Sequence, residues 1–233
     1  MVGPKPVIDL AKQMGIKSKI PYAPSIALGT PDIKLYEMVG AFNTFANQGQ
    51  YIEPIFITRI ENKNGKVLYE YKPVTRDVLS PQIAYVVTNL LEGVTQYGSG
   101  ARLRHTWMKN NPVYKRVVTG YPYAFKNPIA GKTGTTQNQS DGWFIGYVPN
   151  LVTGVWVGGE DRSVHFKSIA YGQGATMALP IWALYMKRNY ADKELGISDK
   201  GFKRPPGVDI PLDCKKPTSD KEKEKEETPL EDL

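Results

Sequence analysis

The sequence predicts an α+β fold, and the order of its segments is the basis for this class. Segments with helical spacing of apolar residues dominate the first part of the chain. Three closely spaced runs of strand-forming residues follow, at 129–136, 142–148 and 151–158. The last two runs are joined through Pro149-Asn150, which is short enough for an antiparallel pair. Antiparallel strands with helices packed on them define the α+β class.

Two helices are expected before the first strands. Residues 4–14 begin with prolines, carry an apolar stripe and end at Gly15. In the next helical segment we expect Thr30 to cap the helix, Pro31 to occupy its first turn and Gly49 to end it. The aromatic residues of this segment lie on its apolar face, so we assign them to the core.

A hairpin and a third helix are expected next. Residues 51–73 contain two alternating runs rich in β-branched and aromatic residues, joined by Asn64-Gly65, a strong hairpin signal. Ser80 with a proline behind it predicts a capped helix that closes near Gly93 or Gly98. Residues 105–128 read as a long irregular loop.

The last helical segment, residues 175–190, contains Pro180, which must lie in the first turn or kink the helix. Beyond it, the chain of 233 residues and 26.0 kDa divides into one domain, residues 1–202, and a tail, residues 203–233. The tail is rich in proline and then in alternating Lys and Glu, a composition that cannot bury apolar surface and predicts disorder.

Charge and composition exclude several classes of site. The formal net charge of +7 suits an anionic surface, but no aromatic RNA-binding motif or recognition-helix signature accompanies it, which leaves nucleic-acid binding as a weak alternative. Cys214 is the single cysteine, and His105 and His165 have no second ligand at metal-binding spacing. We therefore expect no metal and no cofactor. No apolar run is long enough for a membrane span.

The stretch Gly131-Lys132-Thr133 resembles the end of a phosphate-binding loop, but the rest of that motif is missing. A nucleotide loop needs a first glycine that four residues separate from the Gly-Lys pair, and this chain has Lys126 there. It also needs a helix immediately afterwards, whereas the strand-like run WFIGYV follows the turn after Thr135. The sequence does not support a nucleotide site.

A strand over residues 131–136 offers a different kind of binding site. Thr133 and Thr135 would point to one face and Lys132 to the other, while Gly134 would let another chain approach the backbone. Such an edge can bind a peptide by strand addition, with hydroxyls and an ammonium orienting the C-terminal carboxylate of the guest. The alternative is a threonine-rich strand with an exposed lysine and no binding role.

The segment GKTGTTQNQSDGWFIGYVPNLVTGVWVGGED resembles the C-terminal core of class A penicillin-binding proteins. The resemblance extends to residues 25–70, which look like the family's segment that enters an inserted hairpin, and to VVTNLLEGVTQYGSGA, which looks like the helix and glycine loop after it. It covers residues 3–190, with the motifs in the family's order.

The resemblance implies a penicillin-binding transpeptidase fold similar to serine β-lactamases. In this family a serine of a Ser-x-x-Lys motif attacks a peptidoglycan stem peptide ending in D-Ala-D-Ala and passes the acyl group to an amine. A Ser-x-Asn motif assists, and Lys-Thr-Gly-Thr is the third motif, matched here by Lys132, Thr133, Gly134 and Thr135. The implied partners are stem peptides and β-lactams.

The resemblance also implies roles for single residues. Lys132 would sustain positive potential and bond the serine of the second motif. Thr133 and Thr135 would hold the carboxylate of the substrate, within a binding stretch that includes Gly134 and Thr136. The backbone N–H of Thr135 would complete the oxyanion hole, so Lys132 and Thr135 are the expected catalytic residues.

The chain departs from the family because neither Ser-x-x-Lys nor Ser-x-Asn occurs in the family's context. We expect it to begin partway through the transpeptidase domain and to be inert alone, with the upstream part of the same protein as its partner. The resemblance implies action at the outer face of the bacterial inner membrane, through an anchor outside this chain. A non-catalytic module that binds wall peptides by strand addition is the main alternative, and a serine β-lactamase fits the hairpin and tail poorly.

Overall fold

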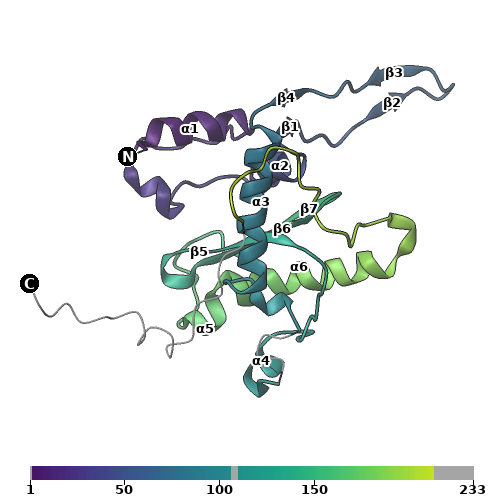
Figure 1. Ribbon diagram of the computed structural model, residues 1–233. Helices are drawn as coiled ribbons and strands as arrows, with labels where there is room; N and C mark the ends of the chain where they lie inside the picture. Colours follow the sequence, from purple (N-terminus) through teal and green to yellow (C-terminus); the bar gives the residue numbers. More distant parts are fainter. Residues whose placement is uncertain (1, 106–109, 213–233) are drawn as a thin grey trace, which may run out of the picture.

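The structure is a computed structural model that describes residues 2–105 and 110–212. Its centre is an antiparallel sheet in the order β5-β6-β7, formed by Ala130–Thr135, Asp141–Val148 and Leu151–Gly158. The helix α6, Gly174–Ala191, packs on one face, and α2, Leu35–Ala46, and α3, Pro81–Gln96, lie on the other (Figure 1). The predicted α+β class and the three antiparallel strands are therefore confirmed.

Alternating side chains of β6 hold the two helical layers to the sheet. Phe144 points toward α6 and makes an edge-to-face contact with Trp182, with ring centroids 5.2 Å apart. Tyr147 points to the opposite face, where its hydroxyl lies 3.0 Å from the hydroxyl of Thr88 on α3. Burial raises the pKa of Tyr147 well above its ordinary value, so the phenol stays neutral and hydrogen-bonded. Side chains of alternating direction thus bury both faces of one strand.

The N-terminal part of the chain follows the predicted pattern with one correction. The helix α1 spans Pro4–Gln13 and is followed by Gly15. This glycine has a φ of +92°, and a Cβ there would lie 2.4 Å from the Tyr51 ring, so the position has no room for a side chain. After η1, Pro24–Leu28, the helix α2 begins at Leu35 and not at Thr30. The Thr30 hydroxyl instead donates to the carbonyl of Ser25, 3.2 Å away, so it stabilises the preceding turn.

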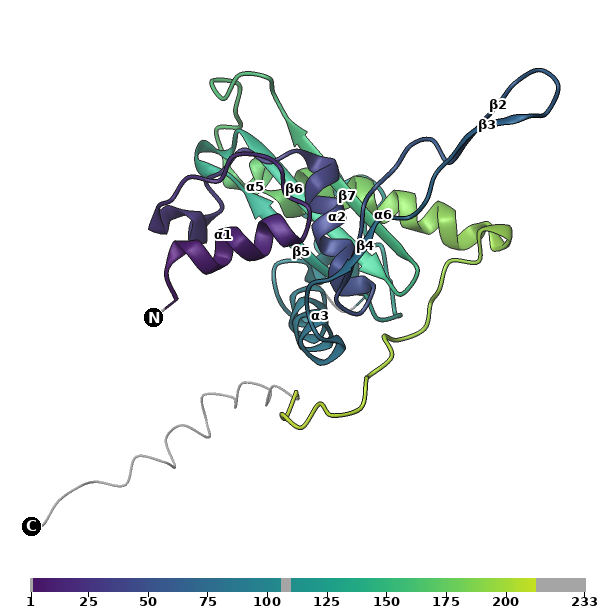
Figure 2. The same ribbon diagram turned by 90° about the horizontal axis from the view of Figure 1, so that it is seen from above.

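A long two-stranded arm leaves the body after α2 (Figures 1 and 2). At its base β1, Gln50–Ile52, pairs with β4, Thr75–Asp77, and at its tip β2, Arg59–Glu61, pairs with β3, Val67–Glu70. The predicted turn is present: Gly65 has a φ of +79° and its N–H donates to the carbonyl of Asn62.

Ser80 caps α3 as predicted, with its hydroxyl accepting from the N–H of Ile83. The turn η2, Ala101–Leu103, follows α3, and one short helix, α4, at Pro112–Val117 interrupts the loop expected over residues 105–128. Residues 106–109 lie outside the described residues. Three more short helical elements occur in the described residues: the 3-10 turns η3, Gln137–Gln139, and η4, Lys193–Leu195, and the helix α5, Ile169–Gly172.

The helix α6 contains Pro180 in its second turn, so the first of the two expected placements, the first turn, is wrong. The proline is buried, as are Trp182 and the small residues of the same helix that face the sheet. The helix comes close to β6 because Gly146 has no side chain, and a Cβ there would lie 2.7 Å from the Trp182 ring. The indole N–H of Trp182 donates to the carbonyl of Gly146, 3.2 Å away, which satisfies the buried group.

The chain after α6 returns along α3 before the described residues end at 212. The side-chain amide of Gln82 donates to the carbonyl of Pro206 at 2.9 Å, and Val208 is buried. The boundary between domain and tail at residue 203 stays a prediction, and the Lys/Glu run lies outside the described residues.

Candidate functional site

The predicted site lies on β5, an edge strand of the central sheet. Its register places Lys132 opposite Ile145, Thr133 opposite Phe144 and Thr135 opposite Gly142 on β6. In the described part of the chain, no strand pairs with the other edge of β5. An unpaired edge carries backbone donors and acceptors that another chain can use.

The backbone of β5 turns alternate residues toward that open edge. The N–H of Thr136 donates to the carbonyl of Asp141, 3.3 Å away, so the backbone of Thr136 faces β6. In an antiparallel pair every second residue shares this direction. The backbone groups of Thr133 and Thr135 therefore face outward, where strand addition needs them.

The two threonine hydroxyls already bond within the protein. The Thr133 hydroxyl lies 2.6 Å from the hydroxyl of Ser99, and either group can donate. The Thr135 hydroxyl accepts from the N–H of Gly174 at the start of α6, 3.0 Å away. A hydroxyl has one hydrogen and two acceptor positions. The bond from Gly174 therefore leaves the hydrogen of Thr135 available to donate to an anion.

The remaining residues of the motif differ in their surroundings. Lys132 is exposed, and its ammonium donates to the carbonyl of Thr133, 2.8 Å away. A Cβ on Gly134 would lie 3.0 Å from the Cβ of Trp143, so the position is already tight. Thr136 bonds Asp141 and Ser140 through its hydroxyl within the turn that follows β5. Its N–H is used in the same turn, so substrate contact by Thr136 stays a prediction.

A glycine at the start of α6 lets this helix meet β5 directly. A Cβ on Gly174 would lie 2.2 Å from the carbonyl oxygen of Gly134 and 2.5 Å from that of Trp143. Both neighbours are backbone atoms, which cannot move aside without moving the strands. The helix N-terminus is thereby fixed against the strand that carries the Lys-Thr-Gly-Thr motif.

A buried arginine supports the entry to β5. Arg104 donates to the carbonyl of Thr95 at 3.1 Å and to that of Asn127 at 2.5 Å, and its second terminal nitrogen bonds the Thr95 hydroxyl at 2.7 Å. The same hydroxyl donates to the carbonyl of Ile129 at 2.5 Å. These bonds tie the end of α3 to the residues just before β5.

The charge of Arg104 is only partly offset nearby. Burial lowers the pKa of Arg104, and the charge of Glu92 opposes this effect. Burial raises the pKa of Glu92, and Arg104 opposes that shift in turn. Because an arginine stays protonated at any physiological pH, a positive charge is kept behind β5.

Sequence reasoning missed three of these contacts. Ser99, Arg104 and Gly174 all reach β5 or the residues before it from distant parts of the chain. The Gly-Ser-Gly sequence at 98–100 indicates a tight loop, but it does not indicate which residue the loop contacts.

Among residues 2–105 and 110–212 we find no group of His, Cys, Asp and Glu side chains able to hold a metal. Within the same residues, no helix has the length and apolar character needed to cross a bilayer.

Comparisons with known proteins agree with this architecture. Residues 18–173 match the penicillin binding protein transpeptidase domain. Penicillin-binding protein 1A of Aquifex aeolicus is 36% identical over 186 residues, which are 80% of this chain and 22% of that protein. Penicillin-binding protein 2D of Bacillus subtilis is 32% identical over 207 residues, 89% of this chain and 27% of that protein. The chain therefore spans about a quarter of the length of these relatives.

Solved structures give the same result. The PonA1 protein from Mycobacterium tuberculosis in complex with penicillin V superposes with a TM-score of 0.67 at 26% identity, covering 89% of this chain and 56% of that one. Penicillin-binding protein 1A from Haemophilus influenzae superposes with a TM-score of 0.67 at 22% identity and covers 88% of this chain and 33% of that one. This similarity shows that the two proteins share a fold. The predicted transpeptidase fold is thus confirmed, and the chain belongs to the penicillin-binding protein transpeptidase family.

Proposed function

We propose that this chain supplies the carboxylate-binding strand of a peptidoglycan D,D-transpeptidase. The observation that carries the proposal is the open edge of β5, where the backbone groups of Thr133 and Thr135 face outward beside an exposed Lys132. The relative PonA1 is described in complex with penicillin V, which supports a β-lactam as a ligand of this fold.

The guest peptide adds along β5 as a further strand. Its terminal carboxylate accepts from the Thr135 hydroxyl, whose oxygen is held by the N–H of Gly174, and from the Thr133 hydroxyl once that group turns from Ser99. The ammonium of Lys132 supplies positive potential at the same edge. Each charge-assisted hydrogen bond contributes about 1.5 to 3 kcal/mol, so two of them suffice to orient the guest.

The outward N–H of Thr135 forms half of the oxyanion hole in this scheme. During acylation, a serine attacks the penultimate D-Ala carbonyl, the carbonyl oxygen gains negative charge, and the terminal D-Ala leaves as an amine. A backbone donor aimed at the developing charge stabilises that transition state, and loss of one such donor typically costs about 10² to 10³ in rate. The acyl group then passes to an amine of a neighbouring peptide.

The nucleophile comes from outside these residues in our proposal. No serine in the 233 residues has a lysine three positions later, so the chain alone is expected to be inert.

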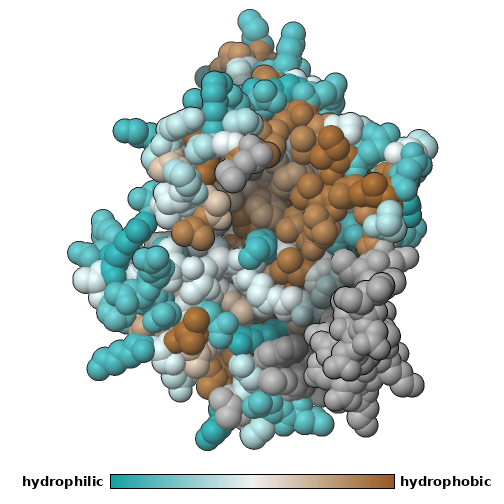
Figure 3. Space-filling model, turned by 60° about the vertical axis from the view of Figure 1, so that its left-hand side comes forward, coloured by the Kyte–Doolittle hydropathy of each residue, from teal (hydrophilic) through white to brown (hydrophobic). Residues whose placement is uncertain are grey.

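Hydrophobic side chains surround a hollow on one face of the molecule (Figure 3), and exposed apolar surface of this kind marks an interaction site. We assign this hollow to the portion of the transpeptidase domain that bears the serine. The site then acts outside the cytoplasm, where peptidoglycan is built.

Labelling with a fluorescent penicillin tests the proposal. The 233-residue chain and the protein extended by its upstream coding sequence are incubated with the reagent and separated on a denaturing gel. We expect label on the extended protein alone. If neither protein is labelled, while the extended protein still binds a D-Ala-D-Ala peptide, a non-catalytic module that uses strand addition is the better account. Label on the 233-residue chain itself would contradict the proposed division of the site.

A further inference from the structure

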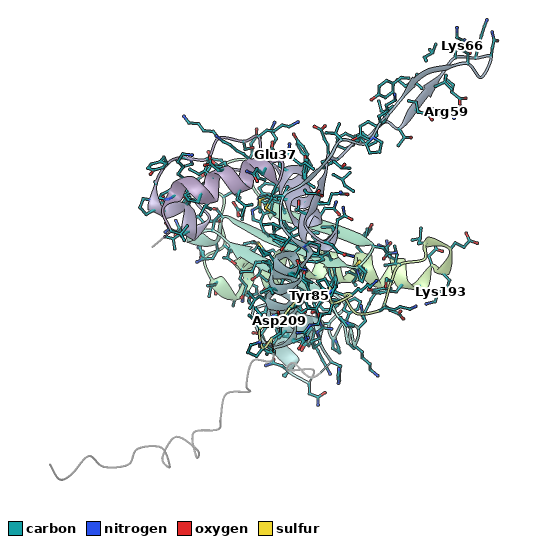
Figure 4. The ribbon with its side chains drawn as sticks, turned by 45° about the horizontal axis from the view of Figure 1, so that its top comes forward. Glu37, Arg59, Lys66, Tyr85, Lys193 and Asp209 are labelled. Atoms are coloured by element: carbon teal, nitrogen blue, oxygen red, sulfur yellow. The ribbon has the colours of Figure 1, made fainter. Side chains whose placement is uncertain are left out.

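The tip of the arm carries a second open edge, far from the candidate site. Figure 4 shows Arg59 and Lys66 on this arm, well away from the body of the molecule. All residues of β2 and β3 are exposed, and the two strands pair only with each other among the described residues. An isolated two-stranded ribbon is marginally stable in water, whereas three or more strands with an apolar face are stable.

The two edges of the arm differ in regularity. The register shifts between Ile60 and Glu61, which leaves Leu68 as an extra residue on β3. Such a bulge disrupts the outer edge of the strand that contains it and hinders further pairing there. The strand β2 has no extra residue, so its outer edge is the regular one.

The hydrogen bonds of the hairpin fix which groups β2 presents at its outer edge. The carbonyl of Thr58 accepts from the backbone N–H of Tyr71 at 2.8 Å, and the N–H of Asn62 donates to the backbone carbonyl of Lys66 at 2.9 Å. The backbones of residues 58, 60 and 62 therefore face β3. By the alternation of an antiparallel pair, the backbone groups of Arg59 and Glu61 face outward.

We propose that β2 pairs antiparallel with β2 of a second copy of this chain, about a two-fold axis at Ile60. In this register Arg59 lies opposite Glu61 of the second copy, and Glu61 lies opposite its Arg59. Both are outward-facing residues, so each pair exchanges two backbone hydrogen bonds. Registers centred on Arg59 or on Glu61 would instead place like charges opposite each other, which is destabilising.

Side chains on both faces fit the same register. Arg59 and Glu61 form an ion pair within one chain, so in the dimer each charge gains a second opposite charge across the axis. Ile60 and its cross-strand neighbour Tyr69 are 44% and 47% exposed, and the dimer joins both with their symmetry mates into one apolar face of four strands. Pairing of a patch with itself about a two-fold axis is the commonest closed assembly. The contact is small, so we expect a weak dimer that cross-linking detects better than sedimentation does.

Disulfide formation tests the position of the axis. In a Cys214→Ser background, Ile60→Cys places two cysteines opposite each other in a non-hydrogen-bonded pair, where Cβ atoms lie about 4.5 to 5.5 Å apart. Mild oxidation is expected to give a covalent dimer at least ten times faster than it does for Lys66→Cys, a control at another exposed position, next to the turn of the same arm. Equal rates for the two variants would overturn the proposal.

Charge reversal tests the register. Both charge variants are made in the Ile60→Cys background. Arg59→Glu leaves glutamate at both 59 and 61, and Glu61→Arg leaves arginine at both. Because like charges then lie opposite each other in the dimer, each variant alone should cross-link at least fivefold more slowly than Ile60→Cys. A mixture of the two, distinguished by size tags, should restore cross-linking as a heterodimer, because every cross-strand pair is again of opposite charge. Mixing cannot restore the ion pair within one chain. Failure of the mixture to recover would contradict the pairing, as would single variants that cross-link at the parental rate.

Discussion

At the scale of single residues, buried polar groups outside the Lys-Thr-Gly-Thr motif decide whether the strand is held in place. Arg104 bridges the end of α3 to Asn127, just before β5, and Thr95 bridges the same helix to Ile129. Glu37 plays a comparable part at the other side of the molecule, where its carboxylate accepts from the N–H of Ser18 at 3.0 Å and ties α2 to the segment after α1. These side chains are buried because each has partners in the backbone.

We predict that Arg104→Ala lowers the free energy of unfolding by at least about 2 kcal/mol, because it leaves buried carbonyls without donors. The measurement is urea unfolding of the variant and its parent. Arg162→Ala removes an arginine whose ion pair with Asp32 is exposed, so it should change stability by less than about 1 kcal/mol. Equal effects from the two substitutions would mean that Arg104 does not support β5.

Glu37 predicts a dependence of stability on pH. Burial raises the pKa of its carboxyl, but hydrogen bonds from Ser18 and Lys17 and the charge of Lys34 outweigh this, and the pKa lies below its ordinary value of 4.5. A depressed pKa means that the unfolded chain binds the proton more readily. The stabilising contribution is present above pH 4.5 and is lost as the pH falls through the folded pKa.

The substitution Glu37→Gln should therefore destabilise the protein above pH 4.5, and its difference from the parent should shrink as the pH falls. Thermal unfolding across this pH range is the measurement. Glu160→Gln, which changes an exposed carboxylate, is the matched control. A difference that stays constant with pH would contradict the assignment of Glu37.

At the scale of elements, the junction between β5 and α6 shapes the site. The helix begins at a glycine that lies against the carbonyls of Gly134 and Trp143, and its first N–H bonds the Thr135 hydroxyl. One contact thus sets both the position of the helix and the direction of a side chain that we assign to the substrate. The proposed site and the packing of α6 on the sheet therefore share the contact at Gly174.

Gly174→Ala is predicted to destabilise the protein by about 1 to 3 kcal/mol, because the added methyl meets backbone atoms that cannot give way. In the extended protein it should also slow acylation by penicillin. Gly201→Ala, where the nearest atom to the new Cβ is 3.7 Å away, is the control for loss of a glycine and should have little effect on either measurement. If both variants unfold alike, the close contact of α6 with β5 is wrong.

At the scale of the whole molecule, two surfaces are open, the hollow of Figure 3 and the arm. We predict that the 233-residue chain binds a dye that reports apolar surface, and that the protein extended upstream binds clearly less. Equal dye fluorescence per molecule would mean that the extension does not cover the hollow. The arm variants at Arg59 and Glu61 should leave this signal unchanged, because both residues belong to β2 of the arm, and Figure 4 shows Arg59 well away from the body of the molecule.

The sequence predicted those parts of the fold that follow from local patterns. The Asn64-Gly65 turn, the Ser80 cap and the strand β6 each follow from neighbouring residues, and all three are present. The start of α2 was misplaced because the Thr30 hydroxyl bonds Ser25, a competing local partner that a Thr-Pro signal does not reveal.

The site was predictable only in part, for a physical reason. Identity and spacing placed Thr133 and Thr135 on one face of a strand, as the register shows. Spacing cannot tell that Ser99 and Gly174 bond their hydroxyls, because these contacts join segments separated by 34 and 39 positions. Nor does a strand pattern tell which edge stays open, since pairing depends on the rest of the sheet.

The most direct test of the central claim compares rates of penicillin acylation in the extended protein. Thr135→Val removes the hydroxyl but keeps the backbone donor, and one lost charge-assisted bond should slow acylation about 10- to 100-fold. Thr135→Ser keeps the hydroxyl, including its bond from Gly174, and should react within a few-fold of the parent. With a penicillin methyl ester, which lacks the free carboxylate, the difference between the two variants should largely disappear. Parental acylation by Thr135→Val, or an equal loss with the ester, would contradict the assignment of this strand to carboxylate binding.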